Sequence, residues 1–180
     1  MGTRGGYVAE FFRPHMGPTD RIIGTANSAW TPGFQACDAG FVLPNVDDLD
    51  YLPAVFELCD REQIDAVVCV EDYDVSKLAE ARTQFVDRGI VPLFPSADVA
   101  ELARDKYRMC TFLTENGIAT PRTATSLEEA SGFAYPLYVK PRRGHGSNQI
   151  FLARTERELA VFFAYAPDMI IQEAAPGEEI

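Results

Sequence analysis

An apolar strand that ends in one lysine and runs straight into a glycine-rich turn limits the folds open to this chain more than any other segment. Residues 135–141 read Tyr-Pro-Leu-Tyr-Val-Lys-Pro, and residues 142–147 read Arg-Arg-Gly-His-Gly-Ser. Lys140 would place a compact ammonium where phosphate oxygens can gather. Gly144 and Gly146 let the backbone come close and point N–H groups at them, and Ser147 adds a hydroxyl donor. The segment therefore predicts a polyphosphate site.

The same segment also fits an ordinary hairpin connection. In that interpretation the glycines serve positions with positive φ, and Arg142 and Arg143 are solvated. The chain contains neither a G-x-x-x-x-G-K-[ST] motif nor a G-x-G-x-x-G motif after a strand, so the usual phosphate fingerprints do not decide the matter.

Segments on both sides of the loop favour the phosphate site. Asp105 and Lys106 open a predicted helix that ends at residues 116–121, Asn-Gly-Ile-Ala-Thr-Pro. Residues 169–173, Met-Ile-Ile-Gln-Glu, predict a strand that leads into Pro-Gly-Glu-Glu at 176–179. In this order these elements resemble the ATP-grasp superfamily, and within it proteins related to the carbamoyl-phosphate synthase large chain. The resemblance covers nearly the whole chain and is most specific from about residue 96 onward.

The resemblance implies an α/β fold with two domains. Residues 1–95 would form a Rossmann-like pre-ATP-grasp domain, and residues 96–180 would form the first, α+β part of an ATP-grasp domain that is truncated at its C-terminus. The residue pattern of the first part predicts strands and helices in alternation. The expected strands are residues 21–25, 41–43, 65–70 and 90–94, and the expected helices are residues 50–63 and one long helix over about 75–86.

Both ends of the chain look short in comparison with the proteins that it resembles. Residues 1–7 lead directly into a helix-like segment at 8–12, where relatives carry an apolar first strand, so we expect the sheet to lack a central member. Relatives bind Mg²⁺ through acidic and asparagine residues on later strands, so we expect those ligands beyond Ile180 and no metal site within the chain. A truncated reading frame is the favoured explanation, and a degenerate first domain is the alternative.

The resemblance also assigns roles to residues. The two lysines would contact the phosphates, the glycine loop would cover them as a mobile lid, residues 173–175 would lie at the adenine, and Glu179, with Glu178 as the alternative, would hold the ribose. Each of these roles has a simpler alternative. Lys106 could be solvated, Glu173 could be an exposed acid at a strand end, and the acids at 178–179 could serve only solubility. The implied ATP-binding residues are Lys106, Lys140, Gly144, His145, Gly146, Ser147, Glu173, Ala174, Ala175 and Glu179.

Three short polar patterns predict local structure. Ser126 with Glu129, and Thr155 with Glu158, have capping-box spacing and predict two helix starts. Residues 71–74, Glu-Asp-Tyr-Asp, follow a predicted strand. They suit either a helix N-cap at the second or fourth position of that run or the binding of an amine or second substrate.

Charge and cysteine content narrow the choice of partners and compartment. The net charge of −11, from 16 basic and 27 acidic residues, argues against a nucleic-acid partner. The four cysteines lack C-x-x-C spacing, and with only two histidines they argue against a zinc site. No signal sequence and no apolar run long enough to span a bilayer are present, so we expect a cytoplasmic protein without a membrane partner.

The leading hypothesis is the ATP-binding portion of a ligase. Such an enzyme uses ATP and Mg²⁺ to activate a carboxylate or carbamate as an acyl phosphate, which an amine-type nucleophile then attacks. Its partners would be small-molecule carboxylates and amines, with a homo-oligomer or a complementing chain as an open alternative. The competing hypothesis is a truncated nucleotide-binding or interaction module without autonomous catalysis. A nicotinamide-dependent oxidoreductase is disfavoured because Gly2, Gly5 and Gly6 follow no strand.

Overall fold

The computed structural model describes residues 3–144, 148–175 and 177, in two units. Unit 1 comprises Met1–Ala100 and unit 2 comprises Glu101–Ile180. The division falls a few residues beyond the domain boundary expected at residues 95 and 96.

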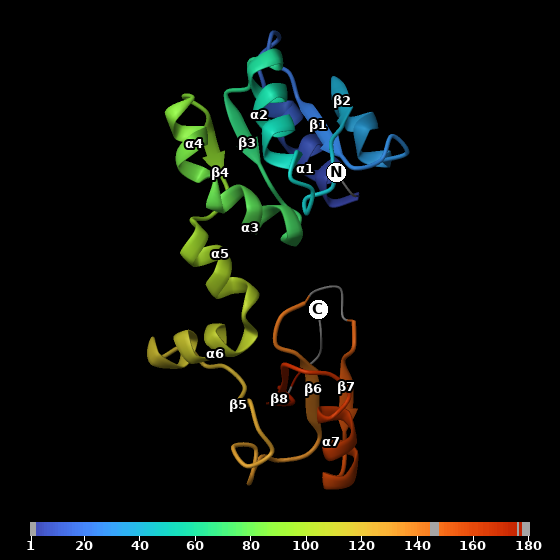
Figure 1. Cartoon of the computed structure of the whole chain (residues 1–180), viewed down its shortest axis with the longest axis vertical. Helices are drawn as coiled ribbons and strands as arrows, with labels where there is room; N and C mark the ends of the chain where they lie inside the picture. Colours follow the sequence, from blue (N-terminus) through green and yellow to red (C-terminus); the bar gives the residue numbers. More distant parts are fainter. Residues whose placement is uncertain (1–2, 145–147, 176, 178–180) are drawn as a thin grey trace. The chain divides into compact units, whose positions relative to one another are not determined.

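Unit 1 alternates short helices and strands along the chain (Figure 1). Its elements are α1 (Thr3–Phe12), the 3-10 helix η1 (Arg13–His15), β1 (Ile23–Ala26), the 3-10 helix η2 (Pro32–Ala36), β2 (Ala39–Val42), α2 (Tyr51–Glu62), β3 (Ala66–Val68), α3 (Asp72–Glu80), α4 (Arg82–Asp87) and β4 (Val91–Leu93). After β4 the chain enters α5 (Ala97–Arg104), which sequence reasoning did not predict.

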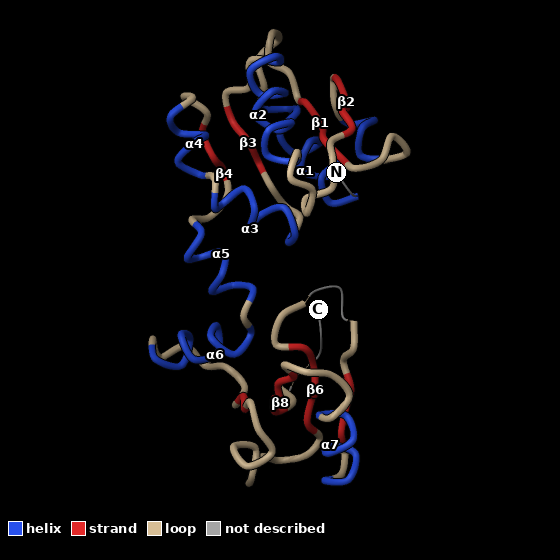
Figure 2. The backbone as a smooth tube through the Cα atoms, viewed as in Figure 1, coloured by secondary structure: helices blue, strands red, loops and turns tan. Residues whose placement is uncertain are grey.

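The described strands of unit 1 form two separate parallel pairs, β1 with β2 and β3 with β4 (Figure 2). Ile23 aligns with Ala39 in the first pair, and Ala66 aligns with Val91 in the second. Among the described residues no strand joins one pair to the other. Pro92 lies in β4, which pairs with β3 alone in the described part of the chain, as its missing N–H predicts.

The core of unit 1 is built on one face of α2. Val55, Phe56 and Cys59 recur at helical spacing and are buried. They belong to one cluster with Phe85, which is fully buried with its ring centroid 4.7 Å from that of Phe56 and 5.5 Å from that of Phe94. The single helix expected over residues 75–86 is wrong, because the chain turns at Ala81 between α3 and α4. Ala81 is itself buried in this cluster, so the turn between the two helices lies within the core.

The acidic run at residues 71–74 stands at the start of a helix, but neither Asp72 nor Asp74 is its N-cap, which was one of the two roles expected for them. The N-cap of α3 is Glu71, which makes no side-chain cap bond, while Asp72 and Asp74 lie in the first helical turn. Negative charge is favourable there through the helix dipole. Asp74 is partly buried beside Tyr51, and this burial raises the pKa of its carboxyl.

Unit 2 is a four-stranded antiparallel sheet with the strand order β5-β8-β6-β7. The predicted helix at residue 106, the predicted strand at 169–173 and the hairpin across the glycine loop are all present. The elements are α6 (Lys106–Glu115), β5 (Thr123–Ala124), β6 (Leu137–Pro141), β7 (Phe151–Ala153), α7 (Glu156–Phe163) and β8 (Met169–Glu173).

One of the two predicted capping boxes starts a helix. Thr155 caps α7, because its Oγ1 accepts from Glu158 N at 3.2 Å and the Glu158 carboxylate accepts from Arg154 N at 2.7 Å. At Ser126 the same bonding occurs, since its Oγ accepts from the backbone of Glu129 at 3.1 Å, yet only turns follow. The second predicted helix start is therefore wrong, and a Gly132 φ of +84° marks where the chain leaves the turn.

The sheet of unit 2 has two different faces. Val139 aligns with Ile171, and Lys140 aligns with Ile170, so successive residues of β6 and β8 alternate between the faces. Lys140 therefore lies on the face opposite the core. The buried core on the other face includes Leu137, Val139, Met169 and Ile171 of the strands and Leu159 of α7, which covers them.

Candidate functional site

Lys140 stands near the end of β6 on the face of the sheet away from α7. Its Nζ donates to Gln172 Oε1 at 2.7 Å. Gln172 is fixed in turn, because its Nε2 donates to Thr123 Oγ1 at 2.9 Å and to Cys110 Sγ at 3.3 Å. Lys140 is therefore oriented by a neutral amide, and within the described residues no carboxylate pairs with its ammonium.

Lys106 brings a second ammonium to the place where β6 ends. Its Nζ donates to Pro141 O at 3.1 Å and to Gly144 O at 2.8 Å. Burial lowers the pKa of both Lys106 and Lys140, and the charge of Lys140 lowers the pKa of Lys106 further. Two partly buried cations that repel each other are stabilised by an anion between them, so this pair suits phosphate oxygens.

A buried ion pair ties the start of α6 to the start of the glycine loop. Asp105 is fully buried, and its carboxylate accepts from Arg142 Nε at 2.8 Å and from Arg142 Nη2 at 2.7 Å. The same carboxylate caps α6 by accepting from Arg108 N at 3.1 Å. Arg142 holds the pKa of Asp105 down at about 2. The backbone reinforces the tie, since Lys106 N donates to Arg142 O at 3.1 Å.

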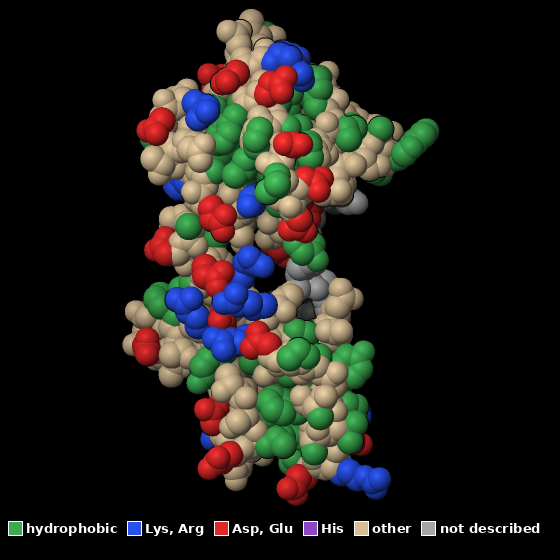
Figure 3. Space-filling model, viewed as in Figure 1, with side chains coloured by type: hydrophobic (Ala, Val, Ile, Leu, Met, Phe, Trp, Pro, Cys, Tyr) green, Lys and Arg blue, Asp and Glu red, His purple; other side chains and the backbone are tan. Residues whose placement is uncertain are grey.

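Basic and acidic side chains gather where α5 ends and α6 begins (Figure 3). Arg143, next to Arg142, forms an ion pair with Glu101 and lies 3.6 Å from Asp105. Both arginines of the loop are thus engaged by carboxylates. The two lysines, in contrast, are bonded to neutral oxygens, which leaves them as the stronger candidates for an anionic ligand.

Glu173 ends β8 with its carboxylate held away from the lysines. It aligns with Leu137, which puts it on the core face of the sheet. Its Oε1 accepts from Ala134 N at 3.2 Å and lies 3.5 Å from Arg122 Nη1. The Glu173 carboxylate therefore lies on the opposite face of the sheet from Lys140.

Comparison with protein families connects this geometry to a known fold. Residues 103–180 match the ATP-grasp domain, and residues 1–93 match the PylC-like N-terminal domain. The chain belongs to the ATP-grasp family. The resemblance and the fold class inferred from the strand, the lysines and the glycine loop are thereby confirmed.

Individual relatives of this ATP-grasp chain are longer proteins. The carbamoyl phosphate synthase large chain of Campylobacter jejuni is 32% identical over 129 residues, which are 68% of this chain and 11% of that protein. N5-carboxyaminoimidazole ribonucleotide synthetase of Thermus thermophilus shares 22% identity and a TM-score of 0.70, over 97% of this chain and 45% of that one.

A further structural neighbour was solved with nucleotide. The biotin carboxylase domain of 2-oxoglutarate carboxylase from Hydrogenobacter thermophilus, in complex with MgADP and bicarbonate, has a TM-score of 0.68 and 18% identity, over 94% of this chain and 42% of that one. The chain spans less than half the length of each of these three relatives. The two structures show that the fold is shared.

The glycine loop is described only at its start. Gly144 has a φ of +143°, a conformation that strains residues with a side chain, and its carbonyl is the one that Lys106 holds. The other expected ATP-binding residues of the loop and of the chain end, His145, Gly146, Ser147 and Glu179, together with Glu178, lie outside the described residues.

Two features of the ATP-grasp site were missed from the sequence. Gln172, which orients Lys140, was noted only as a neighbour of Glu173; its alternation with Glu173 places it on the lysine face, which is the signal that could have found it. Asp105 was noted beside Lys106 without a role. Its N-cap position could be predicted, but its partner Arg142 could not, because the pair joins segments 37 residues apart.

The described residues do not fit a Mg²⁺ site. No group of three or more His, Cys, Asp or Glu side chains among them is arranged to hold a metal ion. Two carboxylates of unit 2 are already engaged by other groups, that of Asp105 by Arg142 and that of Glu173 by Ala134 N and Arg122.

Among the described residues, none of the helices has the length and apolar character that crossing a membrane requires.

Proposed function

We propose that unit 2 carries the phosphate-binding part of an ATP site in a ligase that activates a carboxylate or carbamate as an acyl phosphate. The observation that supports this most is the convergence of Lys106 and Lys140 at the end of β6, each bonded to neutral oxygens. In this proposal both ammoniums bind phosphate oxygens, and Gly144 begins a loop that lies along the triphosphate. Ala174 and Ala175 contact the adenine through their backbone, with Glu173 positioning that backbone.

The proposed chemistry suits a site without a protein nucleophile. A carboxylate oxygen of the substrate attacks the γ-phosphorus of ATP, and the bond to the β-phosphate oxygen breaks to release ADP. An amine then attacks the acyl carbon, phosphate leaves, and the amine loses a proton. Lys106 and Lys140 would hold the phosphates and offset the charge that moves onto the leaving ADP. The Mg²⁺ ligands of such a reaction would come from outside the described residues.

A nucleotide-binding module without catalysis is the second candidate. Such a module would bind nucleotide through the same lysine pair as the ligase but would not catalyse the reaction. Release of ADP that depends on both a carboxylate and an amine would support the ligase, whereas binding without such release would support the module.

Titration calorimetry of ATP and of adenosine against the chain and its Lys140→Met variant tests the site. Charge-assisted hydrogen bonds are worth about 1.5–3 kcal/mol, so the variant should bind ATP about 10- to 100-fold more weakly, while the binding of adenosine, which has no phosphate, changes little. Lys77→Met, in α3 of unit 1, is the matched control and should bind ATP normally. Equal ATP affinities for Lys140→Met and Lys77→Met would remove Lys140 from the site.

A further inference from the structure

Gln172 lies at the centre of a small polar network on the face of the unit 2 sheet that carries Lys140. It aligns with Thr123 of β5, and aligned residues of an antiparallel pair project from the same face with Cβ atoms about 4.5–5.5 Å apart. Lys140 of β6 aligns with Ile170, two residues before Gln172, and is therefore a diagonal neighbour within reach of a long side chain. The register of three strands thus brings Thr123, Gln172 and Lys140 together.

Both polar atoms of the Gln172 side chain make hydrogen bonds. Its Oε1 accepts from Lys140 Nζ at 2.7 Å, and its Nε2 donates to Thr123 Oγ1 at 2.9 Å and to Cys110 Sγ at 3.3 Å. The ammonium of Lys140 can only donate, whereas an amide presents an acceptor on one side and two donors on the other. The orientation of the Gln172 amide therefore decides whether Lys140 meets an acceptor or a second donor.

The Thr123 hydroxyl fixes this orientation. Its single proton is donated to Pro121 O at 3.0 Å, and a backbone carbonyl can only accept. The Thr123 oxygen is therefore left as an acceptor toward Gln172. If the amide turned over, its Oε1 would face the lone pairs of Thr123 and its NH₂ group would face the ammonium of Lys140. The Cys110 thiol does not fix the direction, because a thiol is both a weak donor and a weak acceptor.

We propose that Thr123 is a positioning residue of the nucleotide site, which acts through Gln172 to hold the Lys140 ammonium in place for a phosphate oxygen. The phosphate in this statement rests on the proposed function, whereas the chain of hydrogen bonds from Lys140 to Pro121 O is present without a ligand. Ordering a long side chain costs free energy when a ligand binds, and a lysine that is already held avoids part of that cost. Thr123 should therefore contribute to ATP affinity through Lys140.

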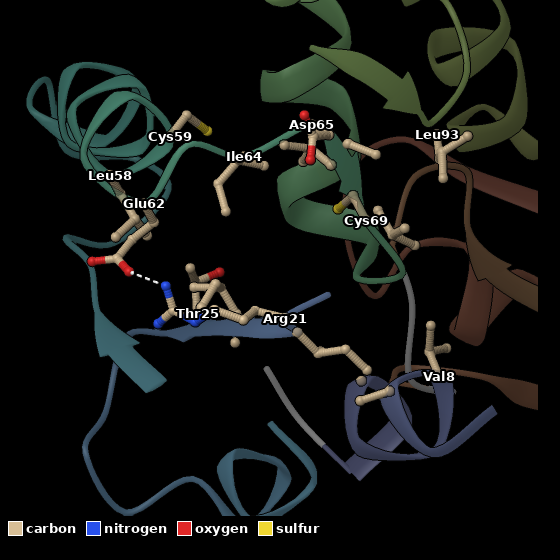
Figure 4. A pocket seen from close by; sticks show the side chains of 18 of the residues that line it. Val8, Arg21, Thr25, Leu58, Cys59, Glu62, Ile64, Asp65, Cys69 and Leu93 are labelled. Carbon is tan, nitrogen blue, oxygen red and sulfur yellow. Dashed lines mark hydrogen bonds and ion pairs between the residues drawn. The ribbon is translucent and has the colours of Figure 1, made fainter. Parts of the chain in front are cut away.

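The test compares Thr123→Val, which keeps the shape and removes the hydroxyl, with Thr123→Ser, which keeps the hydroxyl. Thr25→Val is the matched control, since Thr25 is also a strand threonine and lines a cavity of about 710 Å³ in unit 1 (Figure 4). The first measurement is the pKa of Lys140 without ligand, by NMR of isotope-labelled lysine side chains, with the signal assigned by its loss in Lys140→Met. Lys106 and the Cys110 thiol, whose charges also act on this pKa, are the same in all variants.

Without the Thr123 oxygen the amide can turn its NH₂ group toward Lys140, which disfavours the charged lysine. Thr123→Val should therefore lower the pKa of Lys140 by about one unit and weaken ATP binding, measured by titration calorimetry, about 2- to 10-fold. Thr123→Ser and Thr25→Val should leave both quantities unchanged. An unchanged pKa of Lys140 in Thr123→Val, or an equal fall in Thr123→Ser, would overturn the positioning role.

A double-mutant cycle separates positioning from a general structural effect. If Thr123 acts through Lys140, Thr123→Val should cause no further loss of ATP affinity in the Lys140→Met background. The same loss in both backgrounds would overturn the proposal. The pKa measurement also separates this role from the proposed function: a fall in the pKa of Lys140 that serine reverses, together with ATP affinity that ignores Lys140→Met, would support the positioning of Lys140 and refute its role at the phosphates.

Discussion

Replacing Asp105 by Asn removes one charge of a buried ion pair and keeps the helix cap. The Asp105 carboxylate accepts two hydrogen bonds from Arg142, at 2.8 Å and 2.7 Å, and one from Arg108 N at 3.1 Å. Asn is as good an N-cap residue as Asp, so the bond to Arg108 N can persist. The variant therefore isolates the charge of Asp105, and Arg142 is left without its counter-ion.

The free energy of unfolding that Asp105→Asn loses can be worked out in two ways, which give similar values. Removing one partner of a buried ion pair costs about 3–5 kcal/mol. The Arg142 side chain is 29% exposed, so water compensates part of its charge and the lower end applies. Independently, the pKa of Asp105 falls from 3.8 to about 2 in the folded protein. At about 1.4 kcal/mol per pKa unit that depression corresponds to about 2.5 kcal/mol. We expect Asp105→Asn to lower the free energy of unfolding of unit 2 by about 2–3 kcal/mol at neutral pH.

The same pair sets the pH dependence. Because the pKa of Asp105 is lower in the folded chain than its ordinary value of 3.8, the ion pair stabilises the fold fully above that pH. This stability is lost as the pH falls from about 4 to about 2, where the carboxylate takes up a proton. The difference between the natural chain and Asp105→Asn should therefore stay constant near neutral pH and shrink over that acid range.

Urea unfolding followed by circular dichroism gives the total stability, and hydrogen exchange of peptides from residues 101–180 assigns the loss to unit 2. Fluorescence of the single tryptophan does not serve, because Trp30 lies in unit 1. Glu101→Gln is the matched control: its pair with Arg143 is 38% and 47% exposed, so we expect a change within about 0.5 kcal/mol. Equal effects of Asp105→Asn and Glu101→Gln, or a difference that ignores pH, would refute the reasoning.

Three further substitutions follow from the geometry. Gln172→Leu removes the acceptor for Lys140 and should weaken ATP binding about 2- to 10-fold by calorimetry, less than Lys140→Met; unchanged affinity would contradict the orienting role. Thr155→Ala removes the cap of α7 and should cost about 1 kcal/mol in urea unfolding, while Thr155→Ser should cost much less. Phe85→Ala opens a cavity beside Phe56 and should cost about 3–5 kcal/mol, so a loss below about 1 kcal/mol would show a poorly packed core.

The sequence predicted those elements whose signals are local. β8 and the start of α6 lie where expected, because β8 is marked by an apolar run that ends in polar residues and α6 by an N-cap. The helix predicted after the Thr155 cap is likewise present, as α7. At Ser126 the same local bonding produced only turns, because a cap favours a helix start and does not supply the apolar face that stabilises a helix.

The features that the sequence did not predict depend on contacts between residues far apart in the chain. The turn at Ala81 lies in a core that also includes Phe56 and Phe94, and the periodicity within residues 75–86 does not reveal those distant partners. In the candidate site, the sequence identified both lysines but not the surroundings that orient them. The alignment of β6 with β8 turns Gln172 toward Lys140 and Glu173 toward Ala134, and strand register is set by pairing and not by either strand alone.

The start of the glycine loop is held by contacts that do not involve the Lys106 ammonium. This ammonium can therefore bind the loop carbonyls without a ligand and a phosphate oxygen with one. Without a ligand its ammonium is bonded to the carbonyls of Pro141 and Gly144, which are neutral acceptors. A phosphate oxygen forms a stronger, charge-assisted bond, so a polyphosphate would draw the ammonium away from them. The start of the loop would still be held, because Arg142 keeps its ion pair with Asp105 and its N–H donates to Asp168 O at 2.8 Å. Under the proposed function, Lys106 can therefore turn to the nucleotide and free the carbonyl of Gly144 while the residues before Gly144 stay in place.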